Sequence, residues 1–95
     1  MRLSNFLISK IKKAVFKSFG DVEIYLFGSR IDDKKKGGDI DIAIKGNFNK
    51  EEFKNRKIKF FKELFLMDLD LKIDIVNFNT NDKLLKKGLK KSIKL

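Results

Sequence analysis

The chain has 95 residues, no cysteine, histidine, proline or tryptophan, and a formal net charge of +10. The absence of cysteine excludes disulfides and thiolate metal sites, and the absence of histidine removes the commonest metal ligand and general base. Any chemistry must therefore depend on carboxylates, hydroxyls, lysine, arginine or backbone amides. A chain of this length buries about 60 to 65% of its extended surface, so we expect one compact domain over residues 1–95.

The first twenty residues, MRLSNFLISKIKKAVFKSFG, are interrupted by lysine every few positions. They lack the continuous apolar run of a signal peptide or a membrane span, so we expect a cytoplasmic protein with no membrane association. Lysines are spread along the whole chain, and the aromatic residues are mostly phenylalanines at spacings typical of a core. The charge therefore indicates a solvated surface first and direct nucleic-acid binding second.

Apolar residues at helical spacing predict a first helix between Ser4, a typical N-cap, and Gly20, a typical stop. A β-branched and aromatic run predicts a first strand over residues 22–27, which ends at Gly28. Alternation with a period of two predicts a second strand over residues 40–44.

A second helix is predicted after Asn49, with acidic residues in its first turn. Its apolar face is expected to consist of Phe53, Phe60, Phe61, Leu64 and Phe65. Strict alternation over residues 69–76 predicts a third strand.

The C-terminal region predicts a third helix that starts at Asn81 and is weakened by Gly88. The last four residues fit either that helix or an edge strand. Together the predicted elements indicate an α+β fold, in which helices pack on a small, mixed β-sheet.

Aspartates interrupt two of the predicted strands. Alternation places Asp39 and Asp41 on one face, roughly 6.6 Å apart, and Asp74 can join them if the second and third strands are neighbours. Three converging carboxylates repel one another unless a cation neutralises them, and Mg²⁺ is the natural candidate because it prefers oxygen ligands. Asp70 has the parity of Asp74 but lies about 13 Å further back, too far to share the cluster.

Each of these features alone has a simpler explanation. A lone Asp-x-Asp pair is more often a polar strand face, a lone Gly-Ser pair is usually a turn, and Asp74 alone fits the outward residue of a half-exposed strand. Their order along the chain, with Gly-Ser after one strand and the acids on the next two, favours a functional site.

The segment FGSR at 27–30, followed by DID at 39–41 and KIDIV at 72–76, resembles the polymerase-β-type nucleotidyltransferase superfamily. The short length resembles the minimal nucleotidyltransferase (MNT) branch of that superfamily. The resemblance implies a nucleotidyltransferase fold, a bound nucleoside triphosphate such as ATP, two Mg²⁺ ions, and transfer of NMP to a hydroxyl as pyrophosphate leaves. The loop that follows, IDDKKKGG, differs from the pattern of that branch.

Carried over by this resemblance, the site has two parts. Gly28 and Ser29 would contact the phosphates, and Arg30 matches an arginine common at that point in the minimal branch. The catalytic, metal-binding acids would be Asp39, Asp41 and Asp74, and Asp74 would also help to deprotonate the attacking hydroxyl.

Larger members of the superfamily carry extra domains that bind the acceptor, so a partner protein is expected to complete this site. In the minimal branch the usual partner is a HEPN-family RNase toxin, which the nucleotidyltransferase, as antitoxin, neutralises by attaching AMP to a tyrosine. By resemblance, this is the expected function. Three alternatives remain open: transfer to a small molecule or RNA end, a non-catalytic antitoxin that only binds its partner, and a basic nucleic-acid-binding module.

Overall fold

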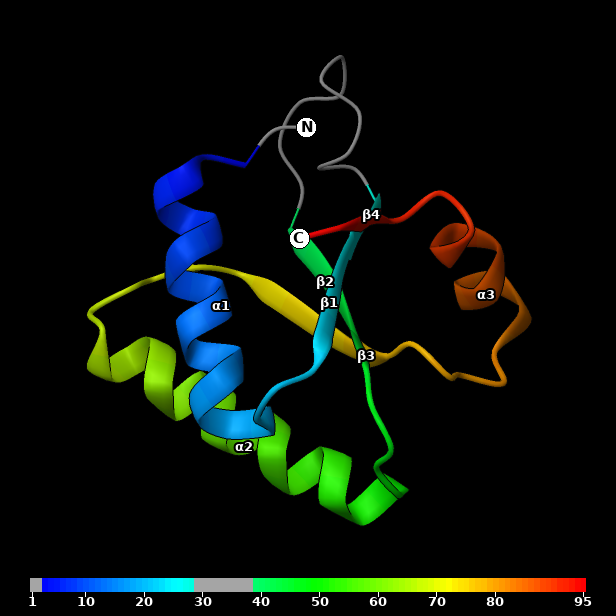
Figure 1. Cartoon of the computed structure of the whole chain (residues 1–95), viewed down its shortest axis with the longest axis horizontal. Helices are drawn as coiled ribbons and strands as arrows, with labels where there is room; N and C mark the ends of the chain where they lie inside the picture. The colour runs from blue at the N-terminus through cyan, green and yellow to red at the C-terminus, as the bar shows by residue number, and fades with distance from the viewer. Residues whose placement is uncertain (1–2, 29–38) are drawn as a thin grey trace.

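The structure, a computed structural model, describes residues 3–28 and 39–95. These residues form three helices and four strands, in the order α1 (Asn5–Phe19), β1 (Glu23–Phe27), β2 (Ile40–Lys45), α2 (Lys50–Leu66), β3 (Ile73–Asn77), α3 (Lys83–Leu89) and β4 (Ile93–Lys94) (Figure 1). The predicted α+β fold with a small mixed sheet is confirmed.

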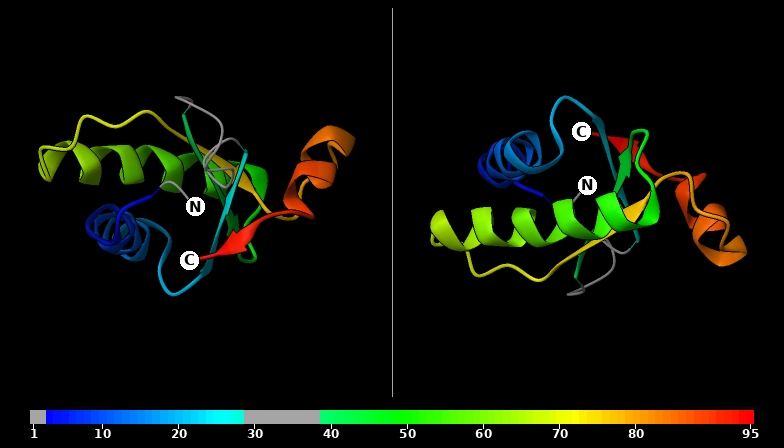
Figure 2. Two further views of the ribbon diagram at one scale, coloured as in Figure 1. Left: turned by 90° about the horizontal axis from the view of Figure 1, so that it is seen from above. Right: turned by 90° about the horizontal axis from the view of Figure 1, so that it is seen from below.

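The strands form one sheet in the order β3-β2-β1-β4. β2 pairs antiparallel with β1 and parallel with β3, and β4 extends the sheet antiparallel to β1. A parallel pair needs a long crossover connection, and α2 supplies it between β2 and β3. α1 and α2 lie on one side of the strands, and α3 lies on the other (Figure 2).

The alternation of β2 separates the main core from the opposite face of the sheet. Ile40, Ile42 and Ile44 are almost completely buried against α1 and α2. The residues between them point the other way, and Ala43 packs under α3 in a second, smaller apolar cluster with Phe27 and Leu89. Asp41, two residues before Ala43, therefore emerges from the face opposite the main core.

The predicted start and end of α1 and the predicted start of α2 are confirmed. The Ser4 hydroxyl accepts a hydrogen bond from the Leu7 N–H, and Gly20 ends α1 with a φ of 85°. Asn49 and Glu52 form a reciprocal capping box at the start of α2. Each of these caps satisfies helix-terminal backbone groups that have no partner within the helix.

Two later boundaries differ from the prediction, and the structure decides between the two alternatives for the last four residues. β3 begins at Ile73 rather than at residue 69, because its parallel partner β2 begins at Ile40, which pairs with Ile73. α3 begins one residue late, because the Asp82 carboxylate, not Asn81, caps it by accepting from two backbone N–H groups. The final residues form the edge strand β4, and the Leu95 N–H donates to the Ile24 carbonyl at 2.8 Å.

The predicted apolar face of α2 is partly wrong. Phe60 and Leu64 are buried, but Phe61 is 38% exposed and Phe65 is 82% exposed. Successive helical residues are rotated by about 100°, so the residue after each buried one turns away from the core. None of the helices in the described part of the chain has the length and apolar character needed to cross a membrane.

Candidate active site

Pairing of β2 with β3 brings two of the predicted site acids together. Asp41 and Asp74 are register partners in the parallel pair, where neighbouring strands lie about 4.8 Å apart. The residues on either side of Asp74 in β3, Ile73 and Ile75, are buried in the main core. Both aspartates therefore project from the opposite face of the sheet, side by side.

The third acid lies at the beginning of the same strand. Asp39 immediately precedes β2 and is exposed, like Asp74, whereas Asp41 is half-buried. Burial raises the pKa of Asp41, and the negative charges of Asp74 and Asp39 raise it further. All three causes disfavour the ionised form of Asp41, so a cation beside these carboxylates would relieve a repulsion that is present without it.

Gly28 lies against this acidic group. It directly follows β1, whose last residue, Phe27, is the register partner of Asp41. Its φ is 79°, in the left-handed region that favours glycine, and a Cβ at this position would collide with the Oδ2 atom of Asp41. The glycine thus allows the end of β1 to approach the Asp41 carboxylate closely.

The other two predicted phosphate ligands, Ser29 and Arg30, lie outside the described residues. The structure therefore leaves these two assignments as predictions. Gly28 is the part of the predicted Gly-Ser turn that can be placed next to the acids.

Two side chains from α2 that were not predicted to belong to the site border it. The Nζ atom of Lys57 lies 4.0 Å from Oδ1 of Asp74. Phe61, one helical turn later, lines a hollow of about 440 Å³ together with Asp39, Asp74 and Leu71. The i, i+4 spacing of Lys57 and Phe61 is visible in the sequence. Only the packing of α2 against the sheet brings these side chains to Asp74, whose strand β3 forms the edge of the sheet.

The donor chemistry of the site suits a hard cation. Asp39, Asp41 and Asp74 offer carboxylate oxygens alone, which Mg²⁺ prefers over nitrogen or sulfur. Among residues 3–28 and 39–95, no three acidic side chains are gathered tightly enough to hold a metal ion. The structure thus places Asp41 beside Asp74, with Asp39 near them, and the three-acid metal site stays a prediction.

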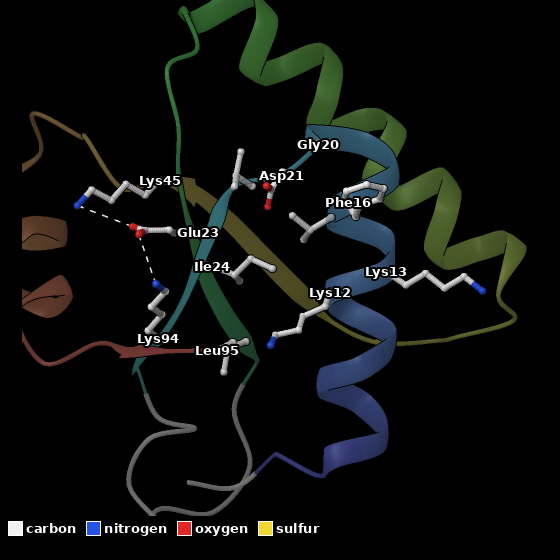
Figure 3. A pocket seen from close by; sticks show the side chains of 12 residues that line it. Lys12, Lys13, Phe16, Gly20, Asp21, Glu23, Ile24, Lys45, Lys94 and Leu95 are labelled. Atoms are coloured by element: carbon white, nitrogen blue, oxygen red, sulfur yellow. Dashed lines mark hydrogen bonds and ion pairs between the residues drawn. The ribbon is translucent and has the colours of Figure 1, made fainter.

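A larger hollow, of about 740 Å³, lies between α1, β1 and β4 (Figure 3). Its lysines are Lys12, Lys13, Lys45 and Lys94. Glu23 in the same groove lies 3.9 Å from the Lys45 ammonium and 3.4 Å from the Lys94 ammonium. None of the predicted site residues that the structure describes lines this groove, so the larger volume of this groove does not identify it as the predicted site.

Comparison with known proteins identifies the family of this chain. A family model described as "Polymerase beta, Nucleotidyltransferase" matches residues 9–95. The matched segment contains the Gly-Ser pair and all three acids. Comparison with curated proteins gives no significant match.

Proposed function

This chain belongs to the polymerase beta nucleotidyltransferase family, and we propose that it transfers AMP from ATP to a tyrosine hydroxyl of a HEPN-family RNase toxin, acting as its antitoxin. Family membership supports nucleotidyl transfer in general. The observation that carries the assignment of the site is the pairing of Asp41 with Asp74 on adjacent strands, with Gly28 packed against Asp41.

The three acids have two roles in the proposed chemistry: all of them bind the metal, and Asp74 also accepts a proton. Asp39, Asp41 and Asp74 would hold Mg²⁺, which when bound neutralises the triphosphate and stabilises the charge that develops on the attacking and leaving oxygens. The hydroxyl oxygen of the acceptor attacks the α-phosphorus of ATP, the bond from that phosphorus to the bridging oxygen breaks, and pyrophosphate leaves. Asp74 is exposed on β3, where its carboxylate can accept the proton of the attacking hydroxyl.

The end of β1 supplies the proposed triphosphate contact. At Gly28 the chain has no side chain and a left-handed φ, which lets a phosphate approach the backbone closely. The Ser29 hydroxyl is proposed to donate to a phosphate oxygen, and the Arg30 guanidinium to neutralise the departing pyrophosphate.

Charge favours an acidic acceptor. The chain carries a formal net charge of +10, which accelerates the encounter with a partner of opposite sign and repels a basic one. The choice of a HEPN-family toxin depends on the resemblance of this short chain to the minimal branch, in which such a toxin is the usual acceptor.

The direct test first asks whether an adjacent gene encodes a HEPN-like protein. That protein is then purified and incubated with this chain, radiolabelled ATP and Mg²⁺. We expect the label to enter the toxin on a tyrosine, and the toxin to stay inactive after the two proteins are separated. Each turnover leaves a modified product, so a few molecules of this chain should silence many toxin molecules. Full recovery of toxin activity after separation, with no gain in mass, would contradict the proposal and favour an antitoxin that only binds.

A further inference from the structure

The outward side of α2 carries large apolar side chains that the described residues do not cover. Ile58 is 60% exposed, Phe61 is 38% exposed and Phe65 is 82% exposed. Their spacing of three and four residues places them on one side of the helix. We call these three residues the apolar stripe. A contiguous exposed apolar surface of this kind is typical of an interaction site.

The middle residue of the apolar stripe, Phe61, borders the acidic site. Phe61 and Leu71 line one hollow with Asp39 and Asp74. Further along, Phe65 lines a second hollow, of about 220 Å³, with residues of the connection between α2 and β3. Figure 2 shows this connection running beside α2 from the end of the helix towards β3. A molecule that covers the stripe therefore also reaches the edge of the proposed active site.

We propose that the apolar stripe is the surface on which the acceptor protein docks, so that its reactive hydroxyl is presented to Asp74. This inference rests on the proposed function and adds the surface that selects the acceptor. The surface fits a partner whose own exposed apolar patch is bordered by acidic side chains. Lysines border the stripe on this chain: Lys54 and Lys62 stand one turn before and after Ile58, and Lys72 lines the hollow that Phe61 shares with the acids.

The composition of the stripe favours a protein over a nucleic acid. Single-stranded nucleic acids bind by stacking bases on aromatic rings and arginine planes. Ile58 in the stripe and Leu71, which lines the hollow beside Phe61, offer no flat ring. The one arginine of α2, Arg56, lies over the Phe48 ring at 5.0 Å and donates to the Ser18 carbonyl. Arg56 is therefore directed towards α1, not towards the stripe. Aliphatic side chains beside aromatic ones suit an apolar protein surface.

The test replaces the stripe and leaves the acids intact. In the double variant Ile58→Glu, Phe65→Glu, both new carboxylates lie at exposed positions and oppose an acidic partner. We expect this variant to label the purified HEPN-family protein at least about tenfold more slowly at low acceptor concentration, through a higher KM. Its affinity for a non-hydrolysable ATP analogue should be unchanged, because the stripe lies outside the proposed nucleotide contacts.

Leu84→Glu on α3 is the matched control, because Leu84 is 82% exposed, like Phe65. This control should label the acceptor like the wild type. Equal labelling by the double variant and the wild type would overturn the docking surface while leaving the proposed function in place. If neither the wild type nor the double variant transfers AMP, but only the double variant fails to bind the HEPN-family protein, the docking surface is upheld and the proposed transfer is contradicted. No binding or labelling by the wild type would overturn both proposals. Binding of a single-stranded RNA oligonucleotide that the double variant alone loses would assign the stripe to nucleic acid.

Discussion

Asp41 on β2 and Asp74 on β3 are register partners in a parallel strand pair, and the charge of Asp74 raises the pKa of Asp41. The register of the two strands holds the backbones of the two aspartates about 4.8 Å apart, which keeps their carboxylates near one another. Nothing in the described residues offsets their repulsion at Asp41, whereas Asp74 has the Lys57 ammonium 4.0 Å away. A cation in contact with both carboxylates would relieve this repulsion.

The first prediction concerns the acids as one unit. Asp39→Asn, Asp41→Asn and Asp74→Asn should each lower Mg²⁺-dependent AMP transfer by at least about a hundredfold, and the double variants should lose little more than the single ones. Transfer of labelled AMP to the acceptor measures this loss. Asp21→Asn, at an exposed position between α1 and β1, removes the same charge elsewhere and should keep full activity. Full transfer by the Asp39→Asn, Asp41→Asn double variant would remove the acids from the mechanism.

The second prediction concerns how Asp41 makes the stability of the folded protein depend on pH. The folded-state pKa of Asp41 is raised, so the folded protein holds this proton more tightly than the unfolded chain does. The stability that protonation provides is present at acidic pH and is lost as the pH rises through the raised pKa. Without Mg²⁺ and at neutral pH, Asp41→Asn should therefore raise the melting temperature above that of the wild type.

Measurements of the same variant at acidic pH and with Mg²⁺ provide two controls. At a pH below the usual range of an aspartate carboxyl, both proteins are uncharged at this position and the difference should disappear. Addition of Mg²⁺ should raise the melting temperature of the wild type but not that of the variant, because only a folded protein that binds the ion is stabilised by it. A variant less stable than the wild type at neutral pH without metal would contradict the repulsion between Asp41 and its neighbours.

The third prediction concerns Gly28, for which Gly20 is a matched control. Both glycines have a φ near 80°, so an alanine at either position costs about 1 to 3 kcal/mol of backbone strain. A Cβ at Gly20 meets open space, whereas a Cβ at Gly28 collides with the Asp41 carboxylate. Both variants should lose stability, but only Gly28→Ala should weaken the binding of a non-hydrolysable ATP analogue, by about tenfold in calorimetry. Unchanged affinity in Gly28→Ala would move the phosphate contact elsewhere.

The fourth prediction concerns Lys57, whose ammonium group would compete with the proposed Mg²⁺ for the Asp74 carboxylate. The pair is largely exposed, so Lys57→Gln should change the free energy of unfolding by less than about 1 kcal/mol. Removal of a competing positive charge should tighten Mg²⁺ binding a few-fold in calorimetry. Lys54→Gln removes the same charge one turn earlier on α2 and should have a smaller effect. An equal effect of the two variants would mean that net charge, not contact with Asp74, controls the affinity.

The fold and the acidic site could be predicted from sequence where the pattern is local. Ser4, Gly20 and Asn49 act within one helical turn, and the alternation of β2 fixes the face of Asp41 without reference to any other strand. The position of Asp74 beside Asp41 depends on one further fact, the pairing of β3 with β2. Contacts between residues distant in the chain determine that pairing.

The parts that the sequence did not predict depend on how α2 is rotated about its axis. The phenylalanines of α2 lie along two sides of the helix, and the sequence alone does not show which side faces the core. In the structure Phe60 is buried, while Phe61 and Phe65 face outward. The same rotation brings Lys57 to Asp74, so the contacts of α2 with the site could be found only from tertiary packing.

The last prediction tests that rotation with two identical substitutions. Phe60 is fully buried in the main core, so Phe60→Ala should lower the free energy of unfolding by about 3 to 5 kcal/mol. Phe65 lies five residues later on the same helix and is 82% exposed, so Phe65→Ala should change it by less than about 0.5 kcal/mol. Chemical denaturation of both variants measures the difference. A cost at Phe65 as large as that at Phe60 would mean that α2 buries the opposite stripe, which would withdraw Phe61 and Phe65 from the proposed docking surface and Lys57 from Asp74.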